Sequence, residues 1–219
     1  MSTRGPYAKG VAKRREILDA ALQVIAEHGY SGATVKEIAE AVGLSQNGLM
    51  HYFGSKDDLF VEVLRRRDEV DAAEFGPSDA AGGASAGGAP TDGADGTDGT
   101  QERAPHDLDG LRRGLIGIVD HNADVPGLVH LFVRLTADGS EPEHSAHAFF
   151  GERYAQLRSL GRDWITGLQE RGEIRADVDP EAAAGMLFAL IDGLQNQWIY
   201  DPDVDMSAQV SAFVDLLRP

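Results

Sequence analysis

Residues 76–105 limit the possible folds of this 219-residue chain more than any other segment. They contain no Val, Ile, Leu, Met, Phe, Trp or Tyr, and consist mainly of Gly, Ala, Asp and Thr. A segment without large apolar side chains cannot offset the conformational entropy lost on ordering. We therefore predict a disordered linker, spanning roughly 30 Å on average, between two folded regions. A partner-binding tail is the alternative.

The two folded regions differ in charge. Residues 1–67 hold ten Lys/Arg and eight Asp/Glu, a net charge of +2. Residues 68–219 hold ten Arg and 28 Asp/Glu, a net charge of −18, and the two values sum to −16. An acidic surface repels phosphates, so the total charge alone argues against a nucleic-acid partner. The uneven distribution instead indicates two regions with different partners.

The apolar spacing before the linker is that of helices. Apolar residues recur at i, i+3 and i+4 over residues 17–28, and Gly29 is predicted to close that helix in the left-handed conformation. A capping box that begins at Thr34 predicts a second helix, which runs to residue 42. Ser45 and Ser55 are predicted to cap a third and a fourth helix, the last running to about residue 74.

The region after the linker is also helical by pattern. We predict five helices there, at residues 108–123, 127–137, 143–171, 180–200 and 207–217. No sustained alternation of apolar and polar residues indicates a strand. The sequence therefore predicts an all-α fold of about nine helices. Its parts are a three-helix N-terminal domain, a connecting helix, the linker and a helical C-terminal domain, at residues 1–54, 55–75, 76–105 and 106–219.

Residues 34–53 fit the helix-turn-helix pattern of two short helices joined by a tight turn. Ala39 is small where the two helices must cross closely. Gly43 can supply the positive φ that the turn requires. Leu49 is expected to anchor the second helix against Ile38 and Val42. These residues alone also fit an ordinary αα-hairpin.

The polar residues of the second helix favour DNA contact over that alternative. The amides of Gln46 and Asn47 can each bond an adenine edge in a major groove, and His51 can donate to a base or a phosphate. Tyr52 and Lys56 suit phosphate oxygens, as do residues at the start of the preceding helix. The full set of predicted DNA-binding residues is Thr34, Lys36, Ser45, Gln46, Asn47, His51, Tyr52 and Lys56.

Residues 11–66 resemble the DNA-binding domain of the tetracycline-repressor (TetR-type) family. The residues that match its motif are Gly43, Ser45, Leu49, Tyr52, Phe53, Ser55, Lys56 and Leu59. Two residues depart from the family pattern. Met50 stands where the family often has a tyrosine that contacts the DNA backbone, and Gly48 replaces a residue that is commonly larger.

The resemblance implies a homodimer whose last two helices pair in a four-helix bundle. It also implies a small-molecule pocket in the middle helices, through which a ligand repositions the DNA-binding heads. Residues 189–203 resemble the dimerisation segment of many members, although the family's connection before the ligand domain is usually short. The expected dimer-interface residues are Leu187, Ile191, Leu194, Trp198, Phe213 and Leu217.

A small-molecule pocket should be mostly apolar with a few convergent polar groups. The candidate pocket residues are His121, His130, Phe132, Arg134, Phe149, Tyr154, Trp164 and Gln195. Arg134 would favour an anionic or carbonyl ligand, whereas the surplus of acidic residues would favour a cation. The sequence leaves this choice open, and plain core packing is an alternative for each aromatic residue.

Other classes of site are not expected. Residues 141–147, EPEHSAH, carry two histidines and two glutamates that could bind a divalent ion, but we interpret them as the solvated start of a helix. The chain has no cysteine, which excludes disulfides and thiolate metal sites. No nucleophile motif, phosphate loop or pair of buried carboxylates indicates an enzyme. We expect no metal and no cofactor.

We therefore predict a cytoplasmic, ligand-responsive transcription regulator, most simply a repressor, with no signal peptide and no membrane span. Its expected partners are double-stranded operator DNA, a second copy of the chain and an unknown small-molecule effector. The basic residues 4–15 either add DNA contacts or form a solvated tail. The alternatives are a DNA-binding regulator without an effector, or a helical ligand-binding dimer without DNA function.

Overall fold

The computed structural model describes residues 6–75 and 107–219, so the predicted linker at residues 76–105 lies entirely outside the described residues. The described parts of the chain form nine α-helices and no strand, which confirms the all-α prediction. The helices are α1 (Pro6–Gly32), α2 (Val35–Ala41), α3 (Gln46–Phe53), α4 (Lys56–Phe75), α5 (Leu108–Asp124), α6 (Pro126–Asp138), α7 (Ser145–Glu170), α8 (Pro180–Tyr200) and α9 (Met206–Leu216). The five helices after residue 107 begin and end within two residues of their predicted limits.

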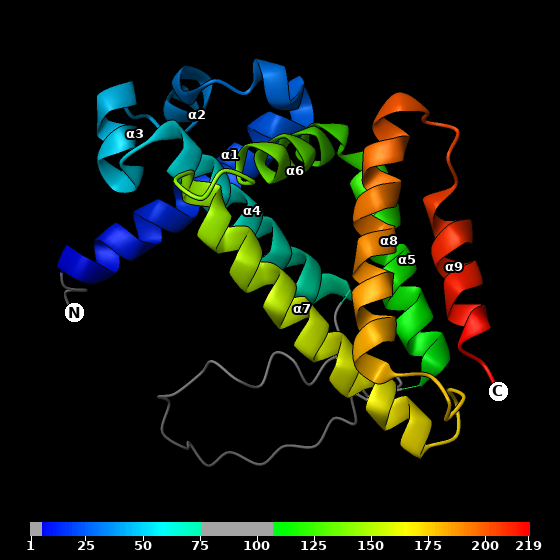
Figure 1. Cartoon of the computed structure of the whole chain (residues 1–219). Coiled ribbons are helices and arrows are strands. Elements are labelled where there is room, and N and C mark those ends of the chain that lie inside the picture. Colours follow the sequence, from blue (N-terminus) through cyan, green and yellow to red (C-terminus); the bar gives the residue numbers. More distant parts are fainter. Residues whose placement is uncertain (1–5, 76–106) are drawn as a thin grey trace, which may run out of the picture.

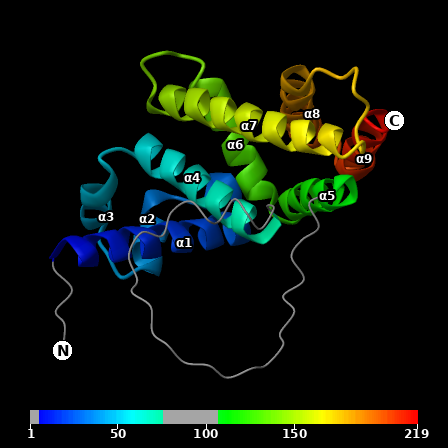
Figure 2. The same ribbon diagram turned by 90° about the horizontal axis from the view of Figure 1, so that it is seen from below.

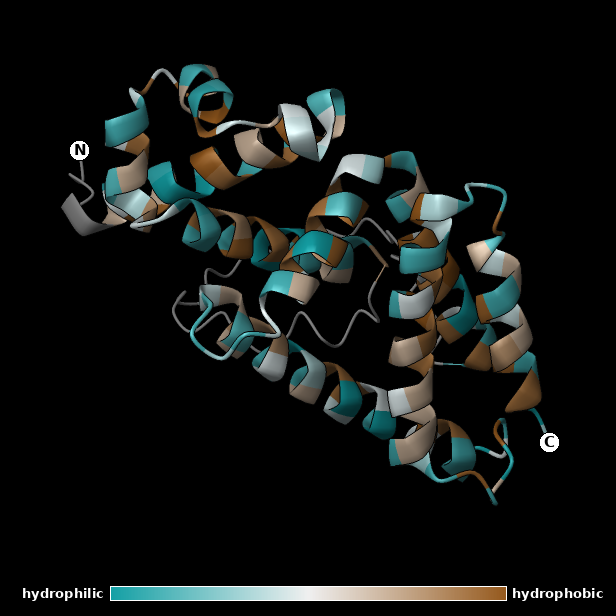
Figure 3. Cartoon of the chain, turned by 45° about the horizontal axis from the view of Figure 1, so that its top comes forward, coloured by the Kyte–Doolittle hydropathy of each residue, from teal (hydrophilic) through white to brown (hydrophobic). Residues whose placement is uncertain are grey.

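The helices are arranged along one long molecule, with the two ends of the chain far apart (Figure 1). Helices α1, α2 and α3 form one end, and α5, α8 and α9 form the other, while α4, α6 and α7 lie between them (Figures 1 and 2). Apolar residues follow the sides on which the helices face one another, as the hydropathy colouring shows (Figure 3). Amphipathic packing of this kind holds short helices such as α2 and α3 in place.

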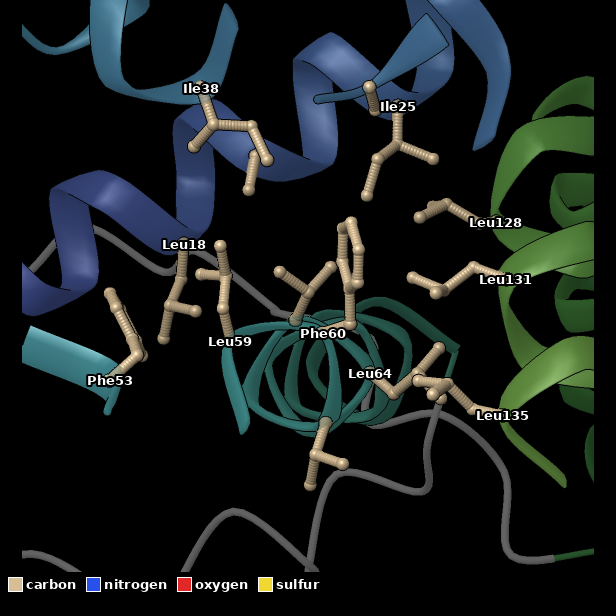
Figure 4. Close-up of a cluster of buried hydrophobic side chains, with 14 of the residues drawn as sticks. Leu18, Ile25, Ile38, Phe53, Leu59, Phe60, Leu64, Leu128, Leu131 and Leu135 are labelled. Carbon is tan, nitrogen blue, oxygen red and sulfur yellow. The ribbon is translucent and has the colours of Figure 1, made fainter. Parts of the chain in front are cut away.

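Two clusters of buried apolar side chains hold the molecule together. The first joins α1, α2, α3 and α4 to α6 and to the start of α7. Phe60 and Leu64 of α4 lie at its centre, between the N-terminal helices and Leu128 and Leu131 of α6 (Figure 4). The second cluster joins α5, the later part of α7, α8 and α9. Because the first cluster continues from α1 into α6, the N-terminal helices are not an isolated unit.

The predicted helix starts at Thr34, Ser45 and Ser55 are confirmed by hydrogen bonds. The Thr34 hydroxyl accepts from the Glu37 backbone N–H at 3.2 Å, and the Thr34 N–H donates to the Glu37 carboxylate at 2.9 Å. This backbone N–H holds the pKa of Glu37 below its ordinary value. The hydroxyls of Ser45 and Ser55 likewise accept backbone N–H groups, at 3.1 and 3.0 Å. Each cap satisfies a donor that a helix start leaves unpaired.

The end of α1 differs from its prediction. Gly29 has a positive φ of 69°, but its ψ of 170° is extended rather than left-handed helical. Gly29 therefore kinks the chain, and one more helical turn follows as far as Gly32. The kink allows close packing, because a Cβ on Gly127 of α6 would lie 2.4 Å from the Ile25 carbonyl oxygen and 2.9 Å from the Gly29 Cα. Only glycine at 127 permits this direct contact between the two backbones.

Candidate nucleic-acid interface and interior polar cluster

Helix α3 separates its apolar and polar residues on opposite sides. Leu49 is fully buried and Phe53 nearly so, and both belong to the first core cluster. Gln46, Asn47 and His51 are exposed. Burial of one side therefore presents two amides and an imidazole to solvent from a helix that is itself firmly anchored.

The turn before α3 has the geometry that its glycine predicts. Gly43 has a φ of 66°, and Ala39, four residues earlier, is buried. The Leu44 backbone N–H donates to the Ala39 carbonyl at 2.9 Å, which fixes the direction in which the chain leaves α2. The prediction of a positive φ at Gly43 is confirmed.

The candidate phosphate-binding residues lie on elements that flank α3. Thr34 and Lys36 are exposed at the start of α2, Lys56 is exposed at the start of α4, and Tyr52 is half-buried in α3. The Lys36 ammonium lies 3.8 Å from Glu40 and the Lys56 ammonium lies 5.3 Å from the centre of the Phe60 ring. Both contacts are exposed and weak, so either lysine can turn toward a phosphate.

The basic residues at the start of the chain are not a solvated tail from Pro6 onward, because they form the first turns of α1. The Lys13 ammonium donates to the Val42 carbonyl at 3.0 Å, and Arg14 Nη1 donates to the Tyr52 carbonyl at 2.6 Å. Cations are favourable at such helix C-termini. The sequence reading missed this positioning role, although Arg14 precedes Leu18 by four residues on the buried side of α1.

An interior polar cluster joins α4 to α5, α7 and α8. We define it as Arg67, Asp68, Asp71, Asn122, Arg153 and Asp192. On the α5 side, Arg67 Nη2 donates to the Asn122 side-chain oxygen, and Arg67 Nε lies 3.5 Å from Asp71 Oδ2. His121 Nε2 lies 3.9 Å from Asp71 Oδ1. Arg67, Asp71 and Asn122 are all at least 94% buried.

On the α7 side, Arg153 forms a bidentate ion pair with Asp68, at 2.7 and 3.3 Å. Tyr154 lies beside Asp192 of α8, and each affects the pKa of the other. The guanidinium carbons of Arg67 and Arg153 lie 5.9 and 5.1 Å from the centre of the same ring, that of Phe132 of α6. Charged groups from two helices therefore converge on one aromatic side chain.

Burial controls the proton affinities of the cluster. It raises the pKa of Asp71 and of Asp192, because neighbouring arginines offset only part of the desolvation. It lowers the pKa of Arg67 and raises that of Tyr154. Each of these shifts favours the neutral form of the group, because the site is poor in water, and ionisable groups in such an environment are typical of functional sites.

Several buried atoms of this region have no hydrogen-bond partner among the described residues. They are Arg67 Nε, Asp71 Oδ1, Asn122 Nδ2, Arg153 Nη1 and, one helical turn after Asp192, Gln195 Oε1. Buried polar atoms are normally paired, and an unpaired one costs about 1–3 kcal/mol. The presence of several such atoms in one region indicates that a ligand or bound water supplies the missing hydrogen-bond partners.

The structure brings only some of the candidate pocket residues together. Phe132, Phe149 and Gln195 are buried, whereas His121, Tyr154 and Trp164 are half-buried. Of these, His121, Phe132 and Tyr154 contact the interior polar cluster directly.

His130 and Arg134 lie on the opposite, exposed side of α6. His130 Nδ1 pairs with the Pro126 carbonyl at 2.8 Å and Arg134 pairs with Asp138 at 2.9 Å. For Arg67 and Asp71, the signal in the sequence was their position. They follow Phe60 at helical spacing, on the side of α4 that faces the core.

The expected dimer-interface residues are mostly inside the chain's own core. Leu187, Ile191, Leu194 and Leu217 are buried in the second cluster, and Trp198 and Phe213 are half-buried against it. The large exposed apolar residues of α8 and α9 are Met186, Tyr200 and Leu216. The assignment of these residues to a dimer interface stays a prediction, and Trp198 and Phe213 are the two of them that keep some exposed surface.

The predicted helix start at 141–147 uses its histidines for backbone contacts. His144 Nδ1 accepts from the Ala146 N–H at 3.1 Å, and His147 Nδ1 pairs with the Gly139 carbonyl at 2.9 Å. Within residues 6–75 and 107–219, no three His, Cys, Asp or Glu side chains gather as a possible metal site. No helix in the described ranges is long and apolar enough to span a membrane.

One end of the molecule is a helix-turn-helix with an exposed polar side on α3. Helix α4 joins it to a helical domain with buried charges. This arrangement defines the class of helix-turn-helix proteins that carry a second helical domain. The profile of bacterial regulatory proteins of the tetR family matches residues 17–63. The profile of the C-terminal domain of BetI-type transcriptional repressors matches residues 111–218. The chain belongs to the tetR family of bacterial regulatory proteins.

Named relatives match about 30% of this chain. The HTH-type transcriptional repressor AcnR of Corynebacterium efficiens is 47% identical over 66 residues, which are 30% of this chain and 35% of AcnR. The chain thus spans about a third of the length of this relative.

Solved structures share the whole fold. A putative TetR-family regulator from Rhodococcus sp. is 24% identical with a TM-score of 0.67, covering 95% of this chain and all of that one. A putative regulator from Saccharomonospora viridis, in complex with choline, is 22% identical with a TM-score of 0.62, covering 94% and 96%. At these identities the likeness concerns the fold alone.

Proposed function

We propose that the protein is a ligand-responsive repressor that binds a pseudo-palindromic operator as a homodimer. The observation that carries this proposal is the polar side of α3, where Gln46, Asn47 and His51 are exposed opposite the buried Leu49. The likeness of a 66-residue stretch to the repressor AcnR supports it. The exposed polar side of α3 also disfavours a helical dimer without DNA function. Both domains favour a role in regulation rather than in catalysis.

The proposed DNA contacts follow from the chemistry of each side chain. Gln46 and Asn47 read base edges in the major groove, where an amide can bond adenine bidentately. Thr34, Lys36, Tyr52 and Lys56, together with Ser45 and His51, contact the phosphates or the groove wall around α3. Two such helices in a dimer meet successive major-groove faces about 34–36 Å apart.

The proposed dimer uses the open side of α8 and α9. Met186 and Tyr200 are 56% and 83% exposed, and Leu216 of α9 is 72% exposed. Gly193 lies between the two α8 residues, and a Cβ there would meet nothing within 4 Å. A small residue between two large apolar ones allows the same helix of a second copy to pack closely, and a symmetric dimer needs such a self-complementary patch.

The proposed effector binds at the interior polar cluster. Arg67 and Asp71 lie on α4, the helix that begins at Lys56 directly after α3. A ligand that binds one arrangement of the cluster more tightly biases the position of α4, and by linkage DNA weakens that ligand by the same factor. The unpaired buried atoms favour this function over a regulator without an effector. The neighbour crystallised with choline supports a small-molecule site in this fold.

The test is selection of bound fragments from random DNA by the purified protein. We expect an enriched inverted repeat. Gln46→Ala or Asn47→Ala should flatten the preference at one position of each half-site, since a bidentate pair discriminates by about 1–3 kcal/mol. Lys56→Ala should weaken binding to every sequence and lower the salt slope by about one unit.

Arg162→Ala, an exposed change on α7 that removes the same charge, is the matched control for Lys56. It should leave both the affinity and the salt slope unchanged. If the selection from random DNA enriches no sequence, the proposed function is wrong. An equal loss from Arg162→Ala would show that Lys56 acts only through net charge.

A further inference from the structure

We propose that the interior polar cluster binds a small molecule with a carboxylate at one position, a hydroxyl or amine donor at another, and a flat apolar body between them. This inference rests on the proposed function, because it names the chemical class of the effector at the same site. It follows from which buried atoms are paired, which are not, and what lies beside them.

The unpaired donors call for an anionic acceptor. Arg67 Nε, Asn122 Nδ2 and Arg153 Nη1 are three buried donors without a hydrogen-bond partner. Two of them belong to guanidinium groups that are otherwise engaged, because Arg153 binds Asp68 through Nε and Nη2 and Arg67 binds Asn122 through Nη2. A carboxylate offers about four acceptor sites on two oxygens, which is enough in number for the three donors. A ligand that carries only an amine would leave them unmatched.

The unpaired acceptors call for a donor on the same molecule. Asp71 Oδ1 and Gln195 Oε1 are buried without a hydrogen-bond partner. Asp71 Oδ1 lies 3.9 Å from His121 Nε2, so Gln195 Oε1 is the acceptor that the ligand's donor serves. A hydroxyl or an amine can donate to it, whereas a carboxylate without a second polar group cannot. The other carboxylates of the cluster already have neighbours of their own, because Asp68 pairs with Arg153, and Asp192 lies beside Tyr154 and near the charge of Arg153. They therefore do not compete for the ligand's donor.

Aromatic rings supply the apolar surface beside these groups. The Phe132 ring faces both guanidinium groups and lies 5.6 Å from the Phe150 ring, edge to face. The Tyr154 ring stacks on Phe150 at 6.0 Å. Such rings pack well against a flat apolar body. The polar ends of the ligand then meet the arginines and the acceptors, while its centre meets the rings.

The experiment uses pairs of probes that differ in one group. The acids are 4-hydroxybenzoate and 4-hydroxyphenylacetate, and their matched primary amides are 4-hydroxybenzamide and 4-hydroxyphenylacetamide. Benzoate lacks the donor, and tyramine replaces the acid with a cation. Binding to the full-length protein is measured by thermal shift and calorimetry.

We expect at least one acid to bind at least tenfold more tightly than its amide, about 1.4 kcal/mol. 4-Hydroxybenzoate should also bind more tightly than benzoate. The inference is overturned if no acid binds, which would leave only bound water to complete the cluster. It is also overturned if the amides bind as well as the acids or tyramine binds best.

Two variants separate the two ends of the ligand. Arg67→Gln should abolish the preference for acid over amide. Gln195→Met should abolish the preference for 4-hydroxybenzoate over benzoate and keep the acid preference, so it still tests the inference if Arg67→Gln fails to fold. Arg134→Gln, on the exposed side of α6, is the control and should change neither ratio. If Gln195→Met leaves the hydroxyl preference intact, the donor assignment is wrong.

Operator binding without any probe separates this inference from the proposed function. Specific DNA binding together with failure of every acid would refute the ligand class and leave the regulator standing. Acid binding without any specific DNA binding would refute the proposed function and leave the ligand class standing.

Discussion

The two ends of the molecule place their polar residues in opposite ways. In the N-terminal helices the residues suited to DNA are exposed, and the core beneath them, with Ile17, Ile38 and Leu49, is apolar. Among residues 8–75 and 107–219, the buried polar side chains are Arg67, Asp71, Asn122 and Gln195, none of them before the second half of α4. A surface that meets phosphates needs only exposed groups on a stable support. A site that encloses a small molecule needs buried polar groups, which weaken the fold that holds them.

Loss of the apolar support should have the largest effect. Leu49→Ala removes a fully buried side chain and should lower the free energy of unfolding by about 2–5 kcal/mol. Because Leu49 belongs to the cluster that continues into α6 and α7, the whole protein should lose stability. Both tryptophans, Trp164 and Trp198, lie in α7 and α8, so their fluorescence reports the C-terminal part during urea unfolding.

Gln46→Ala, on the exposed side of the same helix, is the control and should change the free energy of unfolding by no more than about 0.5 kcal/mol. If Leu49→Ala shifts the circular dichroism but leaves the tryptophan transition unchanged, the two ends unfold independently. The shared core would then not couple them.

The next largest loss of stability should come from disturbing the direct backbone contact between α1 and α6. In Gly127→Ala, the added Cβ would meet the Ile25 carbonyl, so α6 must move away from α1, at a cost of about 1–3 kcal/mol. Gly151→Ala is the matched control, because a Cβ there meets nothing within 4 Å on α7. That change should raise stability by about 0.5–1 kcal/mol, since alanine favours a helix. Equal effects in urea unfolding would show that α1 and α6 are not in tight contact.

A smaller, pH-dependent effect should come from the buried carboxylate of α8. Burial raises the pKa of Asp192, although Arg153, Arg67 and the Tyr154 hydroxyl oppose this and Asp68 adds to it. The folded protein therefore keeps this proton to a higher pH than the unfolded chain does. Its contribution to stability is fully present below the ordinary aspartate pKa and is lost as the pH rises through the raised value.

Asp192→Asn imitates the protonated form at every pH. The variant should gain in urea midpoint relative to the natural protein as the pH rises from 4 toward 8. Asp203→Asn, an exposed change, controls for the loss of one charge. A difference between Asp192→Asn and the natural protein that is constant with pH would mean that Asp192 is ionised throughout.

The smallest effect is expected from deletion of residues 78–103. Five residues would remain between Phe75 and Asp107, enough to reach about 16–18 Å. Phe75 contacts Gly114, and the rise of a helix from 107 to 114 is about 10 Å, so the shortened connection still fits. Operator affinity should therefore change by less than about twofold. A Gly/Ser replacement of equal length separates sequence from length, and a loss of more than tenfold would show an active role.

Local patterns in the sequence predicted the N-terminal helices well. A capping box, a positive-φ glycine and a single apolar side of α3 depend only on neighbours in the chain, so Thr34, Gly43 and Leu49 could be assigned directly. Capping residues and apolar spacing predicted the positions of the nine described helices, apart from the start of α1, which begins at Pro6 rather than near residue 17, and the extra turn after Gly29.

The interior could not be assigned in the same way, because it depends on which helices face each other. Arg134 and Arg153 look equivalent in the sequence, yet Arg134 pairs with Asp138 in solvent while Arg153 pairs with Asp68 of another helix. Similarly, Leu187 and Met186 are adjacent apolar residues, and only the packing of α8 against α5 and α7 decides which one is exposed. The sequence signal available for the interior site was that Arg67 and Asp71 are charged, although they lie on the core-facing side of α4 that begins at Phe60.

The contact between Phe75 and α5 determines where the chain could accept inserted sequence. A Cβ at Gly117 would lie 2.6 Å from the Phe75 ring, and one at Gly114 would lie 2.6 Å from its carbonyl oxygen. The chain thus departs from the middle of α5 and returns at Asp107, the cap of that same helix. Each doubling of the length between these fixed points adds only about 0.6 kcal/mol of closure entropy. This is where the protein could accept a grafted reporter domain, or tolerate repeat expansion, with both halves keeping their places.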